Sequence, residues 1–186
     1  MVPRFADNAV MKIGHPAATE YDTAFERYVS RVPEDDALPA LQRQPAVLRA
    51  TVGSLSPERA GYRYAPGKWS VRELIGHVTD TERIFGYRAL CVARGEAAPL
   101  PGFEQVDYAA HAGHDRYTLP ELLDEFEAVR RANVSMLSHL DETAVLRIGK
   151  ANGLPISVRA LAYIMVGHVR HHLGVLGDKY GIRAAG

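Results

Sequence analysis

Two histidines in the C-terminal part of the chain have a spacing that suits metal binding. His168 and His172 are four residues apart, so on a helix both imidazoles project from one face, one turn apart. The face they share is otherwise apolar, and its neighbouring residues are Leu161, Ile164, Val175 and Leu176. An apolar helical face points toward the protein interior. Two neutral imidazoles can bind one divalent cation but cannot complete its coordination shell, so we expect a third protein ligand.

His77 is the other histidine embedded in a strongly amphipathic segment. A buried neutral ring needs a polar partner, and the core of a helical bundle is a common place for metals held by facing helices. We therefore predict a three-histidine metal site, with at least one open coordination position, formed by His77, His168 and His172. Imidazole suits zinc, nickel, copper and iron(II). The alternative, in which these histidines are core or surface groups bonded to carbonyls or to each other, stays open at this point.

The other histidines receive weaker assignments. His171 is adjacent to His172 and points about 100° away around a helix, so we place it on the bundle surface or in a hydrogen bond to a ligand. His111 and His114 lie in a long connector without a helical frame, and we expect both to be solvated. No chemistry is predicted for His15 and His139.

Two side chains beyond His77 complete the list of candidates. Thr81 lies one turn further along the expected helix and could reach an imidazole N–H or a water at the metal. Glu82 lies about 140° around the helix from His77, so we expect it to pair with an arginine rather than act as a general base. The sequence indicates no convincing protein base, and the catalytic residues stay unknown.

Several well-known chemistries are not supported by the sequence. Val169 stands where a zinc protease of the His-Glu-x-x-His type has its glutamate. A Glu-x-x-His pair for a di-iron centre is absent, as are the glycine-rich dinucleotide loop, the Walker phosphate loop and the Gly-x-Ser-x-Gly elbow.

The composition is that of an ordinary globular protein. The 186 residues are enough for one domain, with 47% hydrophobic residues and 22 basic against 22 acidic side chains. A formal net charge of +0 argues against nucleic acid or an anionic membrane as the main partner. The single cysteine, Cys91, excludes an intramolecular disulfide and is expected to pack in the core. Without a recognisable signal peptide or a run of about 20 apolar residues, we expect a cytoplasmic protein.

The hydrophobic periodicity predicts an all-α four-helix bundle with a small additional N-terminal helix, in a single domain over residues 1–186. Residues 1–18 are expected to form a loose arm. Capping boxes at Ser70 and Thr118 open the second and third main helices, and Pro45 should kink or split the first. The expected helices are a short one over residues 21–32 and four long ones over 36–53, 70–94, 118–140 and 157–180.

Two connectors interrupt these helices. Residues 97–117 form a long segment without clear periodicity, and such segments are often functional. Residues 141–156 contain the turn pair Asn152-Gly153, but no strand is predicted. We expect the segment Pro99 to His114, together with Asn152, to wall a pocket at the metal.

Three sequence segments resemble a known family. They are Tyr-Ala-Pro-Gly-Lys-Trp-Ser at 64–70, Gly-His-Val-Thr-Asp-Thr-Glu-Arg at 76–83, and the run from Gly-His at 167–168 to His-Leu-Gly at 172–174. In this order and spacing they resemble the DinB-like (DinB/YfiT) metalloprotein superfamily. The resemblance extends over about residues 20–180 and includes the segments 100–103 and 151–153.

The resemblance implies a variant four-helix bundle, usually dimeric, in which three histidines bind zinc or nickel. By motif, those ligands fall on His77, His168 and His172. Family members include thiol-dependent S-transferases that use bacillithiol, mycothiol or glutathione, and some isomerases and hydrolases. We therefore expect a homodimeric metal-dependent enzyme with a small-molecule substrate, and prefer an S-transferase with a low-molecular-weight thiol. A metal-dependent hydrolase, a non-catalytic metal-binding or stress-response protein, and a purely structural bundle are the alternatives.

Overall fold

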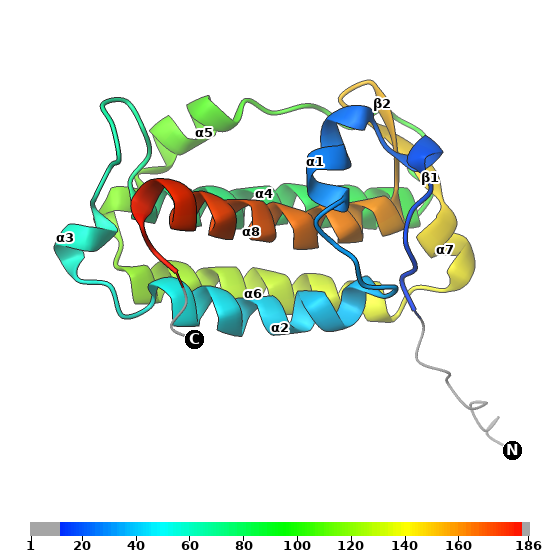
Figure 1. The fold of residues 1–186 in the computed structure, drawn as a ribbon. Coiled ribbons are helices and arrows are strands. Elements are labelled where there is room, and N and C mark those ends of the chain that lie inside the picture. The colour runs from blue at the N-terminus through cyan, green and yellow to red at the C-terminus, as the bar shows by residue number, and fades with distance from the viewer. Residues whose placement is uncertain (1–11, 184–186) are drawn as a thin grey trace, which may run out of the picture.

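The computed structural model describes residues 12–183, and residues 1–11 and 184–186 lie outside the description. Four long helices form the body of the molecule (Figure 1). They are α2 (Ala37–Val52), α4 (Val71–Ala93), α6 (Leu119–Ser138) and α8 (Val158–Tyr180). The predicted all-α four-helix bundle is confirmed.

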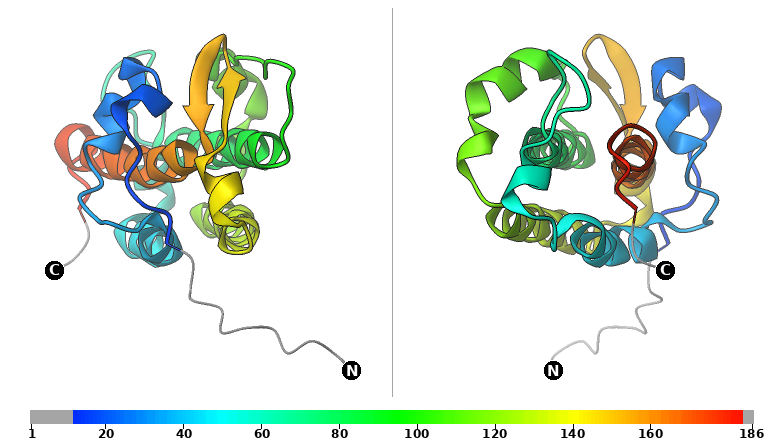
Figure 2. Two further views of the ribbon diagram at one scale, coloured as in Figure 1. Left: turned by 90° about the vertical axis from the view of Figure 1, so that its right-hand side faces the viewer. Right: turned by 60° about the vertical axis from the view of Figure 1, so that its left-hand side comes forward.

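Consecutive long helices are not always neighbours in this bundle. Helices α4 and α2 each pack against both α6 and α8, and the end-on view places α2 diagonally across from α4 (Figure 2). The connections from α2 to α4 and from α6 to α8 therefore cross the bundle. The colour gradients in Figure 1 show that α2 and α8 run in one direction and α4 and α6 in the other. This order brings α4 and α8 side by side.

The ends of the long helices follow the predicted capping signals. The Ser70 hydroxyl accepts a hydrogen bond from the Glu73 backbone N–H, and the Glu73 carboxylate accepts one from the Ser70 N–H. Thr118 and Glu121 make the same reciprocal pair at the start of α6. Helix α8 ends at Gly181, whose φ of 65° is the left-handed conformation that glycine adopts without strain.

Helix α2 corrects part of one prediction, because the helix is continuous and is not split at Pro45. Proline has no backbone N–H, so the Leu41 carbonyl loses its partner within the helix. Nη1 of Arg130, on α6, donates a hydrogen bond to that carbonyl at 3.2 Å. A tertiary contact therefore replaces the missing helical bond, which a reading of local sequence could not anticipate.

A β-hairpin in the second connector was also missed. Strands β1 (Ile148–Ala151) and β2 (Leu154–Ser157) pair antiparallel, with Ile148 opposite Ser157 and Ala151 opposite Leu154. Asn152 and Gly153 have φ values of 51° and 76°, which two-residue hairpin turns require. Four-residue strands are too short to show alternation, although the Asn-Gly pair was a usable signal.

The first connector was predicted to be a loop without regular structure. Instead it contains α5 (Gln105–Ala112) and the 3₁₀ helix η3 (His114–Arg116). Ala109 is the one buried residue of α5, so this helix has no apolar stripe to reveal it in the sequence. The connector is fixed to the hairpin by two backbone hydrogen bonds. The Leu100 N–H donates to the Lys150 carbonyl at 2.8 Å, and the Asn152 N–H donates to the Leu100 carbonyl at 2.9 Å.

The predicted small N-terminal helix is found as η1 (Ala18–Glu20), η2 (Thr23–Phe25) and α1 (Glu26–Val29). Helix α1 packs on α8 so closely that a Cβ at Gly167 would lie 2.0 Å from the Tyr28 carbonyl oxygen. Most of the predicted arm, residues 1–11, lies outside the described residues. In its described part, Ile13 is fully buried and its N–H donates to Asp36 Oδ1 at 3.1 Å. Two further short helices are α3 (Pro57–Ala60) and α7 (Glu142–Leu146).

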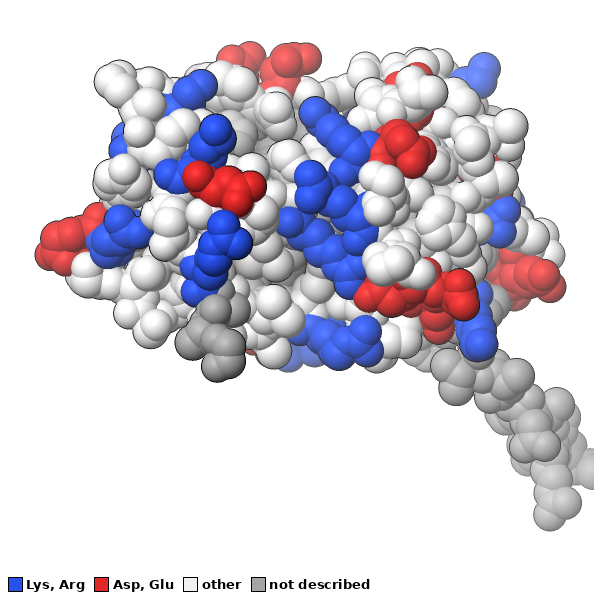
Figure 3. Space-filling model, in the orientation of Figure 1, with Lys and Arg blue, Asp and Glu red and all other residues white. Residues whose placement is uncertain are grey.

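The buried apolar residues form two clusters along the bundle. On the face drawn in Figure 3, acidic and basic side chains are interspersed, and basic ones gather across the middle. Among residues 12–183, no helix combines the length and hydrophobicity needed to cross a membrane.

Candidate metal centre

The structure brings together the three histidines that the spacing selected. His77 comes from α4, and His168 and His172 come from successive turns of α8. One ring nitrogen of each lies within 4.8 Å of the corresponding nitrogens of the other two. The Nε2 atoms of His168 and His172 are 3.1 Å apart. All three rings are buried, so the cluster lies in the bundle interior.

The hydrogen bonding of this cluster is incomplete. Nε2 of His77 and Nδ1 of His172 are buried, and neither has a hydrogen-bond partner among the described residues. An unpaired buried polar atom costs about 1–3 kcal/mol. Nε2 of His77 is therefore open to a bound cation, whereas Nδ1 of His172 is the second nitrogen of a ring whose Nε2 faces His168.

The donor set fits a divalent cation. Zinc lies about 2.0–2.1 Å from an imidazole nitrogen, which puts tetrahedral ligands roughly 3.4 Å apart. The His168–His172 separation of 3.1 Å is already close to that spacing. The ligand nitrogen of His77 lies within 4.8 Å of those of the other two histidines. A movement of at most about 1.4 Å would therefore bring it to the same spacing.

Burial also sets the protonation state of the three rings. Burial, with the nearby His114 and His171 adding to its effect, lowers the pKa of His77 to about 4. Burial takes the pKa of His168 and His172 well below the usual value, with neighbouring imidazoles adding to the effect. The rings are therefore neutral at pH 7, which is the form that binds metals.

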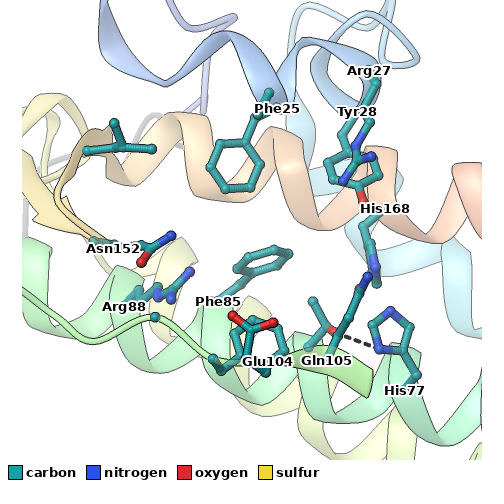
Figure 4. A pocket seen from close by; sticks show the side chains of 16 residues that line it. Phe25, Arg27, Tyr28, His77, Phe85, Arg88, Glu104, Gln105, Asn152 and His168 are labelled. Carbon is teal, nitrogen blue, oxygen red and sulfur yellow. Dashed lines mark hydrogen bonds between the residues drawn. The ribbon is translucent and has the colours of Figure 1, made fainter. Parts of the chain in front are cut away.

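The side chains around the cluster limit the movement of its rings. Thr81 Oγ1 lies 3.4 Å from Nδ1 of His77, drawn as a dashed line in Figure 4, so the predicted contact with an imidazole nitrogen is present. The Trp69 ring lies 4.7 Å from the His77 ring, and the Tyr28 ring lies 5.3 Å from that of His168. These contacts hold the imidazoles in a mainly aromatic environment.

The prediction that His114 is solvated is wrong, because its side chain is buried. Its ring lies on α4 at Gly76, where a Cβ would come within 2.2 Å of the imidazole. Nε2 of His114 is 3.7 Å from Asp80 Oδ2. Gly76, directly before His77 inside an amphipathic helix, was the sequence signal that another group approaches there.

The remaining histidines stay outside the cluster. His171 is half-buried, with its ring 5.5 Å from that of Tyr28 and 5.1 Å from that of His172. His111 is exposed, as predicted, and bonds the Asp107 carbonyl. His15 and His139 also lie apart from the cluster. His15 bonds the Pro16 carbonyl, and its ring lies 4.7 Å from that of Tyr163; exposed His139 bonds the Ser135 carbonyl.

A cavity of about 280 Å³ borders the cluster on the side of His77 and His168. Its wall includes the predicted connector and Asn152, as Figure 4 shows. The lining residues used below are Phe25, Arg27, Thr81, Phe85, Arg88, Gly102, Phe103, Glu104, Gln105 and Asn152. A second cavity of about 280 Å³ borders His172 and is lined by Trp69 and Tyr180 among others. The histidines therefore lie between two hollows.

Glu82 belongs to a different buried cluster. As predicted, it pairs with an arginine: Arg130 donates from Nε and Nη2 to its two carboxylate oxygens at 2.8 and 2.9 Å. Arg130 also donates to Gln44 Oε1 at 2.7 Å, and Gln44 Nε2 donates to the Val166 carbonyl at 2.7 Å. The burial of Arg130 and Gln44 in a polar cluster was not predicted from the sequence, although both interrupt apolar helical faces.

Comparisons with known proteins agree with this architecture. The family model described as the DinB superfamily matches residues 40–176. A protein of Oceanobacillus iheyensis, provisionally named a metal-dependent hydrolase, is 26% identical over 128 residues, which are 68% of this chain and 73% of that protein.

A solved structure extends the comparison. YfiT from Bacillus subtilis, described as a probable metal-dependent hydrolase with an unusual four-helix bundle topology, matches with a TM-score of 0.70 at 17% identity. The match covers 78% of this chain and 86% of YfiT. At that identity the likeness establishes a shared fold.

Proposed function

This chain belongs to the DinB superfamily, and on that premise we propose that it is a metal-dependent hydrolase of small molecules. His77, His168 and His172 would hold one divalent cation. The observation that carries the proposal is the set of three neutral imidazoles with ring nitrogens within 4.8 Å of one another, in which Nε2 of His77 is buried and unpaired and His77 and His168 line a cavity. Zinc or nickel suits such a donor set. The hydrolase names of the two relatives support the reaction class.

The expected chemistry divides between the ion and the protein. A divalent cation held there would supply Lewis acidity, polarising a carbonyl and lowering the pKa of a water. Thr81 orients the His77 ring through Nδ1, and the cavity admits a substrate to the side of His77 and His168. Phe25 and Phe85 line the same cavity and exclude water from much of its surface.

Thiol-dependent S-transfer, which the sequence analysis preferred, has no support in the comparisons, because both named relatives are described as hydrolases. It stays a prediction, as do the homodimer, the cytoplasmic location, the low-molecular-weight thiol and the identity of the metal. A purely structural bundle would not need the unpaired imidazole nitrogens found here.

The test is an activity screen on protein purified without an affinity tag. The chain is stripped with a chelator, reloaded with zinc, nickel or cobalt, and assayed against a panel of carboxylate esters and amides. We expect hydrolysis by the loaded wild type, loss on stripping, and loss in His77→Ala with unchanged circular dichroism. Equal activity of stripped and loaded protein, or of wild type and His77→Ala, would overturn the proposal. Tight metal binding without hydrolysis across the panel would favour the non-catalytic alternative.

A further inference from the structure

The cavity that borders His77 extends along one face of α4 to Arg88. Thr81, Phe85 and Arg88 follow His77 by 4, 8 and 11 residues, so they lie about 40°, 80° and 20° around the helix from it. All four side chains line the cavity. The two ends of this row, His77 and Arg88, are about 16 Å apart along the helix axis at 1.5 Å per residue.

Arg88 is a buried cation without an acidic partner. It is 5% exposed, and Nη2 donates to the Pro101 carbonyl at 2.8 Å. Among the residues that the structure describes it forms no ion pair, whereas Arg130, which is also buried, donates two hydrogen bonds to Glu82. Burial lowers the pKa of Arg88. A buried charge left unpaired is costly, so this guanidinium is available to an anion from outside the chain.

The surroundings of Arg88 form a defined recess. Asn152 lies at the hairpin turn, and a Cβ at Gly102 would come within 2.5 Å of its Oδ1, so the amide lies against the connector. The Phe103 ring is 5.8 Å from Cζ of Arg88. Figure 4 shows Arg88 and Asn152 together at one end of the cavity and His77 at the other, with Phe85 between them.

The other charged groups on the cavity wall restrict where an anion can bind. Glu104 is exposed and pairs with no arginine among the described residues. In Figure 4 its carboxylate lies below Phe85, between the Arg88 end of the cavity and Gln105. Arg27 is exposed near the His168 end, with its guanidinium over the Tyr28 ring. The recess is therefore the part of the cavity wall where a buried guanidinium, that of Arg88, lies near an exposed amide, that of Asn152.

We propose that Arg88 and Asn152 form a carboxylate-binding subsite. The planar guanidinium suits a carboxylate, and the amide of Asn152 can donate to the same group. Phe25, Phe85 and Phe103 would enclose an apolar middle portion of the ligand. The substrate class follows from combining this subsite with the proposed function, on which this last step rests. It is an extended carboxylic acid whose hydrolysable bond lies at the end remote from its carboxylate.

Binding of one matched ligand pair tests the subsite without relying on catalysis. The ligands are 4-phenylbutanoate and its neutral amide, 4-phenylbutanamide, titrated by calorimetry into the full chain as purified and after metal removal. We expect the acid to bind at least ~10-fold more tightly than the amide, as loss of a charged hydrogen bond of about 1.5–3 kcal/mol implies. Arg88→Gln should abolish this preference, and Arg88→Lys should keep part of it.

Arg83→Gln is the matched control, because Arg83 lies on the same helix in an exposed ion pair with Glu125 and should leave the preference unchanged. Equal affinity of the wild type for acid and amide would overturn the subsite, as would an undiminished preference in folded Arg88→Gln. If Arg88→Gln fails to fold, Arg88→Lys decides: full loss of the preference despite the retained charge would contradict the proposal. Hydrolysis without any charge preference would refute the subsite alone, and charge-selective binding without hydrolysis would refute the proposed function alone.

Discussion

Two buried polar clusters both involve α4 and α8 but differ in how far their hydrogen bonds are satisfied. Around Arg130, the guanidinium, the Glu82 carboxylate and the Gln44 amide bond one another and two backbone carbonyls. Around His168, by contrast, two of three imidazoles have an unpaired buried nitrogen. The first cluster is complete within the chain, while the second requires a group from outside it.

The two clusters are close neighbours in sequence. Glu82 directly follows Thr81, which contacts His77, and the Val166 carbonyl that Gln44 bonds lies two residues before His168. The complete cluster therefore fixes α4 and α8 beside the points where they present the histidines. The Arg130 cluster therefore holds helices together, whereas the histidine cluster has nitrogens available to a ligand.

The largest expected effect is the loss of stability when the complete cluster around Arg130 is broken. Arg130→Ala should lower the free energy of unfolding by about 3–5 kcal/mol, because it leaves the Glu82 carboxylate buried without a counter-charge. It also removes the donor to the Leu41 carbonyl beside Pro45. Urea denaturation of metal-free protein measures the change.

Two controls sharpen this result. The double variant Arg130→Leu with Glu82→Leu should lose less stability than Arg130→Ala, because it leaves no unpaired charge. Arg83→Ala, in the exposed pair with Glu125, should cost less than about 1 kcal/mol. An Arg130→Ala variant as stable as wild type would show that the cluster does not hold the helices.

The next effect concerns pH and the histidine cluster. The pKa of His77 is about 4 in the folded chain and about 6.5 in the unfolded one. Between these values the unfolded chain binds more protons, so stability is full above pH 6.5 and falls as the pH drops toward 4. From pH 7 to pH 5, His77 alone should account for about 2 kcal/mol in metal-free protein.

His77→Ala provides the comparison for this pH series. Urea denaturation at several pH values should give a shallower slope for the variant than for wild type. Equal slopes would mean that the folded state protonates His77 as readily as the unfolded state does.

The smallest effect tests the support of the histidine cluster. Thr81→Val keeps the shape of the side chain but removes the hydroxyl 3.4 Å from Nδ1 of His77. Loss of such an orienting contact should weaken metal binding about 10-fold, and stability should change by less than about 1 kcal/mol. Competition with a chromogenic chelator measures the affinity; unchanged affinity would remove Thr81 from the site.

Local sequence signals predicted the parts of the molecule that depend on one helix at a time. The capping boxes at Ser70 and Thr118 fixed the starts of α4 and α6, and the spacing of His168 and His172 placed both rings on one face of α8. His77 was chosen because a neutral ring in an amphipathic helix needs a partner. The predicted pocket wall followed from the length of the first connector and from the turn residues at Asn152.

The rest depended on contacts between distant segments. Pro45 was expected to kink or split α2, which is not split, and the residue that compensates for it, Arg130, lies 85 positions later in the sequence. His114 was expected in solvent because nothing in its own segment shows that it packs over Gly76. The burial of Arg88 became apparent only when the connector and hairpin were seen to cover it, since a single charge in an apolar helical stripe usually reaches solvent.

Calorimetric titration of zinc into chelator-stripped, tag-free protein tests the central claim most directly. We predict that the wild type binds one ion per chain. Affinity should be lower by at least ~100-fold in His77→Ala, since losing a direct ligand should cost more than losing an outer contact. His139→Ala, whose ring is exposed, should bind zinc as tightly as the wild type. Absence of stoichiometric binding by the wild type, or equal affinity of His77→Ala and wild type, would contradict the three-histidine site.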